Sequence, residues 1–120
     1  MNKQEKGNAG EKLARSALKR KGYRIIGQNY RCRYGEIDII ARHKDSLVFI
    51  EVRSKTGTSF GSPEESLTSG KKQRLISTAL DYLSKHGKPD EAWRFDFVAV
   101  RLEAVPGKNA EVEILQNIIN

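Results

Sequence analysis

The chain has 120 residues, of which 22 are Lys or Arg and 15 are Asp or Glu, so its formal net charge is +7. This length suits a single domain over residues 1–120, because domains of about 100–150 residues are the commonest size. No apolar run is longer than the four residues of Leu47–Ile50, which is too short to cross a bilayer, and the polar N-terminal residues argue against a secretory signal. A single cysteine, Cys32, excludes an internal disulfide. These features predict a cytoplasmic protein with no membrane partner.

The positive charge is concentrated in the first part of the chain. Residues 1–35 carry ten Lys and Arg but only two acids, Glu5 and Glu11. A concentrated positive field attracts polyanions, of which nucleic acid is the commonest. A basic helix that only aids solubility is an equally good interpretation of the charge alone. A helix bound to a membrane surface is a poorer one, because residues 13–18 lack bulky aromatic side chains.

The first predicted element is a helix that ends at Gly22. Gly7 and Gly10 weaken its first turns, which favours a start near Asn8. Its apolar residues recur at helical spacing: Ala9, Leu13, Ala14, Ala17 and Leu18.

Three strands are predicted next, at 23–26, 36–41 and 47–53, the last two being rich in β-branched residues and joined by a polar turn. After a Gly/Ser-rich loop at 56–63 comes a second helix that starts after either Ser62 or Thr68 and ends at Gly87. One face of this helix is expected to carry Leu75, Ile76, Ala79, Leu80 and Leu83.

Two final strands are predicted at 95–100 and 112–115, with a turn at 106–109 between them. The element order is therefore αβββαββ. This order predicts an α/β fold with a single mixed sheet of about five strands and flanking helices.

Acidic side chains converge on the central hairpin. Because side chains alternate along a strand, Glu36 and Asp38 share one face, as do Glu51 and Arg53. A tight turn would place Asp38 opposite Glu51 and Glu36 opposite Arg53, whereas a slip of two residues would pair Asp38 with Arg53. Two facing carboxylates repel unless a cation or a shared proton lies between them. A divalent metal is one interpretation and a solvated sheet face is the other, with the cation of Arg53 favouring the metal.

Short sequence motifs mark three of the predicted strands: GEID at 35–38, FIEVR at 49–53 and RFDFV at 94–98. With Gly10-Glu11 and residues 71–74, these motifs resemble the YraN-like proteins over about residues 7–102. This bacterial family is assigned to the PD-(D/E)xK nuclease-like superfamily and is similar to archaeal Holliday-junction resolvases. The resemblance implies a restriction-endonuclease-like fold and metal-dependent hydrolysis of DNA phosphodiesters.

The resemblance also implies roles for individual residues. Asp38 and Glu51 are expected to bind Mg²⁺ or Mn²⁺, with Glu11 as a further ligand from the first helix. Arg53 occupies the position of the superfamily's catalytic lysine. A guanidinium stays protonated, so Arg53 can bind phosphate but cannot act as a general base. Lys55, two residues further on, is the candidate replacement.

Structural roles compete with several of these assignments. Glu11 lies three residues after Asn8 and could close a capping box with it. Asp96 is expected to bond to Arg94 or to a neighbouring backbone group. Surface positions are expected for the two histidines, His43 and His86.

Basic residues around the motifs are the candidate nucleic-acid contacts. Two of them begin the second helix, where backbone N–H groups favour anions. The full set is Lys12, Arg15, Lys19, Arg31, Arg33, Lys71 and Lys72.

Two functions follow from the sequence. The first is a metal-dependent endonuclease acting on DNA at branched structures, with a homodimer expected by analogy with resolvases. The second, motivated by Arg53, is a module that keeps the nuclease fold and binds DNA, or an acidic protein, without cleavage.

Overall fold

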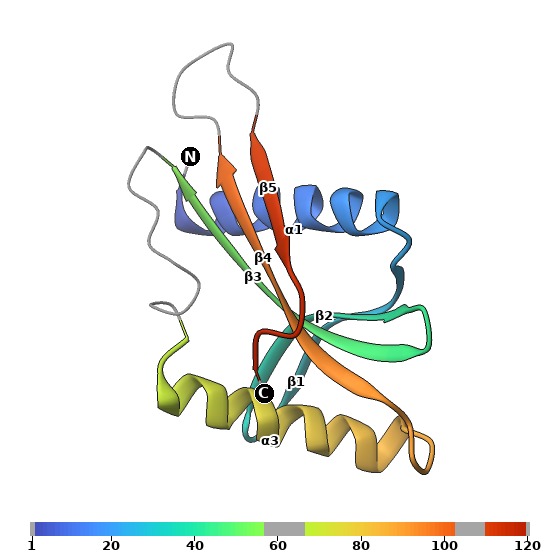
Figure 1. The fold of residues 1–120 in the computed structure, drawn as a ribbon. Helices are drawn as coiled ribbons and strands as arrows, with labels where there is room; N and C mark the ends of the chain where they lie inside the picture. The colour runs from blue at the N-terminus through green and yellow to red at the C-terminus, as the bar shows by residue number, and fades with distance from the viewer. Residues whose placement is uncertain (1, 57–66, 103–109, 120) are drawn as a thin grey trace.

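A five-stranded mixed sheet forms the centre of the computed structural model, which describes residues 2–56, 67–102 and 110–119. The strands lie in the order β1-β2-β3-β4-β5 (Figure 1). The elements are α1 (Lys3–Arg20), β1 (Arg24–Cys32), β2 (Gly35–His43), β3 (Ser46–Thr56), α3 (Ser69–His86), β4 (Trp93–Leu102) and β5 (Glu111–Leu115). The predicted α/β class and the order αβββαββ are confirmed. The predicted loop beyond Thr56 and the turn at 106–109 lie outside the described residues.

The sheet combines two kinds of strand pairing. β1, β2 and β3 form an antiparallel meander, and β5 is antiparallel to β4. β3 and β4 are parallel, and parallel neighbours need a crossover connection, in which α3 lies.

The two helices cover opposite faces of the sheet (Figure 1). α1 packs across β3 and β4, while α3 packs mainly against β2. Because both faces of the sheet are covered, the side chains on both faces of the central strands are buried, and their sequences are nearly continuously apolar. The core under α1 includes Leu18, Ile39, Val48, Ile50, Val98 and Val100. The core under α3 includes Ile40, Phe49, Leu75, Phe95 and Phe97. None of the described helices is long and apolar enough to span a membrane.

The start of α1 differs from the prediction. The helix begins at Lys3 because Asn2 caps it: the Asn2 side chain accepts the Glu5 N–H at 2.8 Å, and the Glu5 carboxylate accepts the Asn2 N–H at 3.3 Å. This capping box lies six residues before the alternative at Asn8. The structural role suggested for Glu11 is therefore wrong, and Glu11 lies well inside the helix.

The second helix starts at the later of its two predicted positions. Thr68 is the N-cap of α3, its hydroxyl accepting the Lys71 N–H at 3.3 Å, and Gly87 ends the helix as predicted. The alternative start after Ser62 lies outside the described residues. The predicted apolar face was too wide, because Leu80 is 51% exposed whereas Ala79 is buried.

Asp96 is the centre of a buried polar network. Its carboxylate accepts the Tyr23 hydroxyl at 2.6 Å, the Arg94 Nε–H at 2.9 Å and the Asn117 backbone N–H at 2.9 Å. The structural role predicted for Asp96 is confirmed. This network fixes the residues after β5 and the residue before β1 to the beginning of β4.

His43 also belongs to this network, so its predicted surface position is wrong. The imidazole is buried, stacks on Tyr23 with ring centroids 4.0 Å apart, and lies 2.8 Å from Arg94 through Nδ1. The reason is packing: the last residue of β2 turns its ring towards Tyr23, where an aromatic partner and a guanidinium satisfy it. His86 is exposed, as predicted.

Candidate active site

The carboxylates lie where β2 and β3 separate. The hairpin ladder runs from His43 opposite Ser46 to Ile39 opposite Ile50, which confirms the register with Asp38 next to Glu51. Beyond this point the Asp38 carboxylate itself accepts the Val52 N–H at 2.8 Å. A side chain thus replaces a backbone partner and occupies the opening between the strands.

Glu36 does not form the predicted pair with Arg53. It lies beyond the last β2–β3 pair and forms an ion pair across β1 and β2 with Arg31 at 2.9 Å. The separation of the strands is the physical reason, because it removes Glu36 from the reach of β3.

Asp38 and Glu51 behave as one acidic pair. Burial, and then the neighbouring Glu51 charge, raise the pKa of Asp38 to about 8, while the Val52 N–H acts in the opposite direction. The closeness of the Glu51 carboxylate to Asp38 thus favours the protonated form of Asp38. Asp38 therefore keeps its proton at neutral pH until another cation takes its place.

Two cations approach Glu51 from different elements. Lys71 of α3 places Nζ 2.5 Å from the Glu51 carboxylate, and Arg53 of β3 places Nε 3.7 Å from it. The side chains of Glu51 and Lys71 are 12% and 19% exposed, against 44% for Arg53. Lys71 is thus the closer and better buried of the two cations. The candidate Lys55 is exposed and lies further along β3, opposite Arg101 of β4.

Glu11 reaches the same region from α1. Burial raises the pKa of Glu11, and the charges of Glu36 and Glu51 add to this effect while Arg15 opposes it. With its amide nitrogen turned towards the acids, Asn29 of β1 donates to Glu11 at 3.2 Å and to Glu36 at 3.3 Å. Asn29 has a φ of 52°, a conformation that asparagine adopts more readily than most residues. Five elements, α1, β1, β2, β3 and α3, therefore bring polar groups to this region.

The donor set suits a hard divalent cation without forming a complete cage. Across residues 2–56, 67–102 and 110–119, no group of three or more His, Cys, Asp or Glu side chains is arranged to hold a metal ion. Mg²⁺, however, usually binds through one or two carboxylates together with waters and phosphate oxygens. Asp38 and Glu51 fit this pattern, so metal binding, including a contribution from Glu11, stays a prediction.

The predicted nucleic-acid contacts fall into two groups. Lys12, Arg15 and Lys19 lie on α1, with both lysines exposed. The others lie at the end of β1, in the β1–β2 turn and in the first turn of α3: Arg31, Arg33, Lys71 and Lys72. Of these, Arg31 is paired with Glu36, Arg33 lies over the Tyr34 ring at 4.8 Å, and Lys71 contacts Glu51.

Sequence reasoning missed the contact between Lys71 and Glu51 and the contribution of Asn29. Lys71 was predicted to meet phosphate, yet it neutralises a carboxylate inside the protein. The only signal was the Thr68 cap, which places Lys71 in the first turn of α3. Asn29 carried no motif, because its role depends on a left-handed backbone conformation within β1.

The raised pKa of Asp38 predicts a pH-dependent stability. The pKa of Asp38 is about 8 in the folded protein, against an ordinary value of 3.8. Between these two values the unfolded chain loses the proton while the folded protein keeps it, so the folded state is destabilised as pH rises from about 4 towards 8. The metal-free protein should lose at least about 1.4 kcal/mol of unfolding free energy, the equivalent of one pKa unit. Urea unfolding across this pH window measures the change. Asp38→Asn should flatten the profile, and an unchanged slope in that variant would contradict the assignment.

Gly10 sets the distance between α1 and β3. A Cβ at position 10 would overlap the Ser54 hydroxyl and lie 2.6 Å from the Ser54 Cβ. Gly10→Ala should therefore destabilise the protein by about 1–3 kcal/mol through overpacking, despite the better helix propensity of alanine. Ser54→Gly should restore most of the loss in the double variant, as measured by thermal unfolding. Gly7→Ala, which meets nothing within 4 Å, is the control and should not destabilise the protein.

The chain is similar to one protein family over most of its length. The model of "Uncharacterised protein family UPF0102" matches residues 10–100. A UPF0102 protein of Moorella thermoacetica is 44% identical over 103 residues, which cover 86% of each chain. A second, of Caldanaerobacter subterraneus subsp. tengcongensis, is 35% identical over all 120 residues and 96% of its own length. A third, of Nocardia farcinica, is 39% identical over 97% of this chain and 90% of its own. The matched range contains the motifs at 35–38, 49–53 and 94–98.

Proposed function

We propose that this chain, which belongs to the uncharacterised protein family UPF0102, the family of the YraN-like proteins, is a metal-dependent endonuclease that hydrolyses DNA phosphodiesters. One observation carries the proposal: Asp38 and Glu51 lie next to each other where β2 and β3 separate, and two cations, Arg53 and Lys71, lie beside Glu51. A pair of carboxylates and a phosphate-binding cation are the groups that metal-assisted phosphodiester hydrolysis needs.

Asp38 and Glu51 are the residues that would hold Mg²⁺ or Mn²⁺, and the chemistry supplied there is activation of water and neutralisation of charge on the phosphodiester. The proton on Asp38 must leave before both carboxylates can bind a cation, so metal binding is expected to strengthen as pH rises. The Val52 N–H keeps one Asp38 oxygen in place while the proton leaves.

Arg53 and Lys71 are the residues that would bind the scissile phosphate. Arg53 is the more exposed, and its planar guanidinium can donate two parallel hydrogen bonds to phosphate oxygens. Lys71 is held against Glu51 and can stabilise negative charge that develops next to that carboxylate. This division of roles needs no general base at position 53.

The basic residues of α1 and of the β1–β2 turn would bind flanking phosphates. Such contacts carry no sequence information, and the motifs include no base-reading element. We therefore expect recognition of DNA shape or branching and a steep fall of affinity with salt.

A cleavage assay tests the proposed activity directly. Purified protein is incubated with branched, single-stranded and blunt duplex DNA in Mg²⁺, Mn²⁺ or EDTA. Cleavage with either metal and none in EDTA is the expected result. Cleavage that persists in EDTA would refute a metal-dependent mechanism.

The contact between Lys71 and Glu51 favours a second candidate, a module that binds DNA without cleaving it. In that case Lys71 permanently neutralises the acid that would otherwise hold a metal. The same assay separates the candidates, because this one predicts salt-sensitive DNA binding with no cleavage in any metal.

Replacing Lys71 by methionine should lower kcat by about a hundredfold, the usual cost of removing one charge-stabilising donor. KM should change little, because the other basic residues still bind the flanking phosphates. Steady-state kinetics on one DNA substrate measure both constants. Lys72→Met is the matched control on the neighbouring residue, and equal effects of the two changes would contradict a specific role for Lys71.

A further inference from the structure

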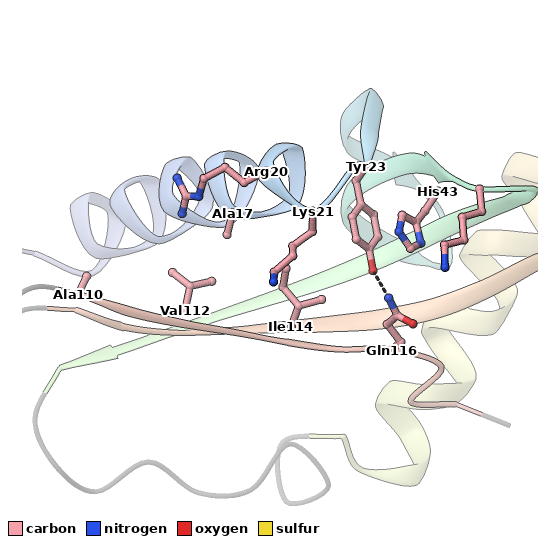
Figure 2. A pocket seen from close by; sticks show the side chains of 10 residues that line it. Ala17, Arg20, Lys21, Tyr23, His43, Ala110, Val112, Ile114 and Gln116 are labelled. Atoms are coloured by element: carbon pink, nitrogen blue, oxygen red, sulfur yellow. Dashed lines mark hydrogen bonds between the residues drawn. The ribbon is translucent and has the colours of Figure 1, made fainter.

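A polar cavity lies on the other side of α1 from the candidate active site. Its volume is about 640 Å³, and it opens between the C-terminal end of α1, the β2–β3 turn and β5 (Figure 2). We call it the α1–β5 pocket. Its volume falls in the range of about 300–1,000 Å³ that is typical of small-molecule sites.

The rim of the α1–β5 pocket is positively charged. Arg20 and Lys21 come from the end of α1, and Lys44 comes from the β2–β3 turn. None of the described residues that line the pocket is acidic, and none of these three cations forms an ion pair with a described residue. The C-terminal end of a helix carries partial negative charge. An anion here must therefore be held by the side chains rather than by the helix.

The floor of the pocket is apolar. Ala17 of α1 faces Val112 and Ile114 of β5, and Lys21 extends into the space between them (Figure 2). Such a floor suits the face of a flat ring, which stacks on apolar surface while a charged group stays at the rim.

The inner wall of the pocket is polar and rigid. The stacked rings of Tyr23 and His43 form this wall, and Gln116 donates to the Tyr23 hydroxyl at 3.2 Å. Burial and the charges of Arg94 and Lys44 lower the pKa of His43, so this wall adds no positive charge at neutral pH. Because the buried Asp96 network holds Tyr23, the pocket is formed before any ligand binds.

Helix geometry relates the pocket to the candidate active site. Arg20 follows Glu11 by nine residues, which is about two and a half helical turns, so the two side chains project from opposite flanks of α1 about 14 Å apart along the axis. Counting in the same way, Arg15, Lys12 and Lys19 project from the outer half of α1 between these flanks. A row of basic residues therefore joins the two sites.

We propose that the α1–β5 pocket binds one unpaired nucleotide, its base over the apolar floor and its phosphate among Arg20, Lys21 and Lys44. The choice of ligand rests on the proposed function. The strand that carries this nucleotide crosses α1 along the row of basic residues and reaches the acidic pair a few nucleotides away. The pocket thus makes DNA with a single-stranded branch or end the preferred substrate class, since a paired base is not available to enter it.

Binding without metal tests the pocket separately from cleavage. The protein carries Asp38→Asn and Glu51→Gln, and the probe is a fluorescent oligothymidylate of about ten nucleotides, within the usual length bound by one small domain. Competitors are thymidine monophosphate, inorganic phosphate and a blunt hairpin duplex. Amide chemical shifts of Val112, Ile114 and Lys44 report whether thymidine monophosphate enters the pocket, which distinguishes a free nucleotide from one within a strand.

Two variants separate charge from shape. Arg20→Ala/Lys44→Ala should weaken oligonucleotide binding by about tenfold and lower the slope of its salt dependence by about two, one for each lost phosphate contact. Val112→Ala removes apolar surface from the floor without a change of charge, so it should weaken binding by about fivefold and leave the salt slope unchanged. Lys85→Ala/Lys88→Ala removes one charge at the end of α3 and one just after it, and is the control, with an expected change below about twofold.

Several results would overturn the pocket assignment. Wild-type affinity in Val112→Ala would show that the base does not bind on the apolar floor. Inorganic phosphate that competes as well as thymidine monophosphate would show that the pocket binds only an anion. A blunt duplex that competes as well as a single strand would contradict the proposed preference for an unpaired nucleotide. Retained pocket binding in a protein that cleaves nothing would overturn the nuclease proposal and leave the pocket intact.

Discussion

Replacing Asp38 by asparagine is expected to lower kcat for DNA cleavage by at least about a thousandfold, because the change removes one of two carboxylates that can hold the metal. Asparagine keeps the size of the side chain, and its amide oxygen can still accept the Val52 N–H. The loss should therefore reflect chemistry and not a rearranged β2–β3 opening. Single-turnover cleavage with saturating enzyme measures this step without a contribution from DNA binding.

Two comparisons make this result decisive. Glu51→Gln should have an effect of similar size, and Asp45→Asn, the same chemical change in the β2–β3 turn, should leave kcat within about twofold. Asp38→Asn and Glu51→Gln should both bind DNA at least as tightly as the wild type, because each removes negative charge from a phosphate-binding surface. Cleavage that survives both Asp38→Ala and Glu51→Ala would refute the assignment of the site.

Replacing Asp96 by alanine is expected to cost about 3–5 kcal/mol of unfolding free energy, the usual penalty for breaking a buried ion pair on one side. Asp96 is 1% exposed, and its loss leaves the Arg94 guanidinium, the Tyr23 hydroxyl and the Asn117 N–H without their acceptor. Urea unfolding followed by circular dichroism at a fixed pH measures the change.

A double variant identifies the source of this penalty. If the unpaired Arg94 charge is responsible, Arg94→Met in the Asp96→Ala background should recover part of the lost stability. Glu113→Ala, an exposed acid on β5, is the control and should change stability by less than about 0.5 kcal/mol. A cost of less than 1 kcal/mol for Asp96→Ala would contradict the buried network.

Much of the fold was predictable because its signals are local. β-branched runs separated by short polar turns identify the strands, and the tight turn after His43 fixes the register that places Asp38 beside Glu51. Element ends were less predictable. The start of α1 depends on the cap at Asn2, which competes with an equally plausible cap at Asn8 until the first turns pack.

Much of the site depends on contacts between distant residues, which no local pattern contains. Lys71 contacts Glu51, which lies twenty residues earlier in the chain. His43 is buried against Tyr23 because two residues of β4 hold the rings: Asp96 bonds to Tyr23, and Arg94 contacts His43. Motif resemblance identified the acids of β2 and β3. It could not identify the cation beside them, since the expected position carries Arg53 and the closer cation comes from α3.

The order of the strands has a consequence for how the protein folds. β1, β2 and β3 are joined by short turns and can form early, because local pairing has a low entropic cost. The parallel pairing of β3 with β4 must wait for the crossover that contains α3, which also delivers Lys71. The nascent meander therefore brings Asp38 and Glu51 together before the α3 cation arrives. A proton is the partner available from the start, so acidic conditions should speed this early folding step.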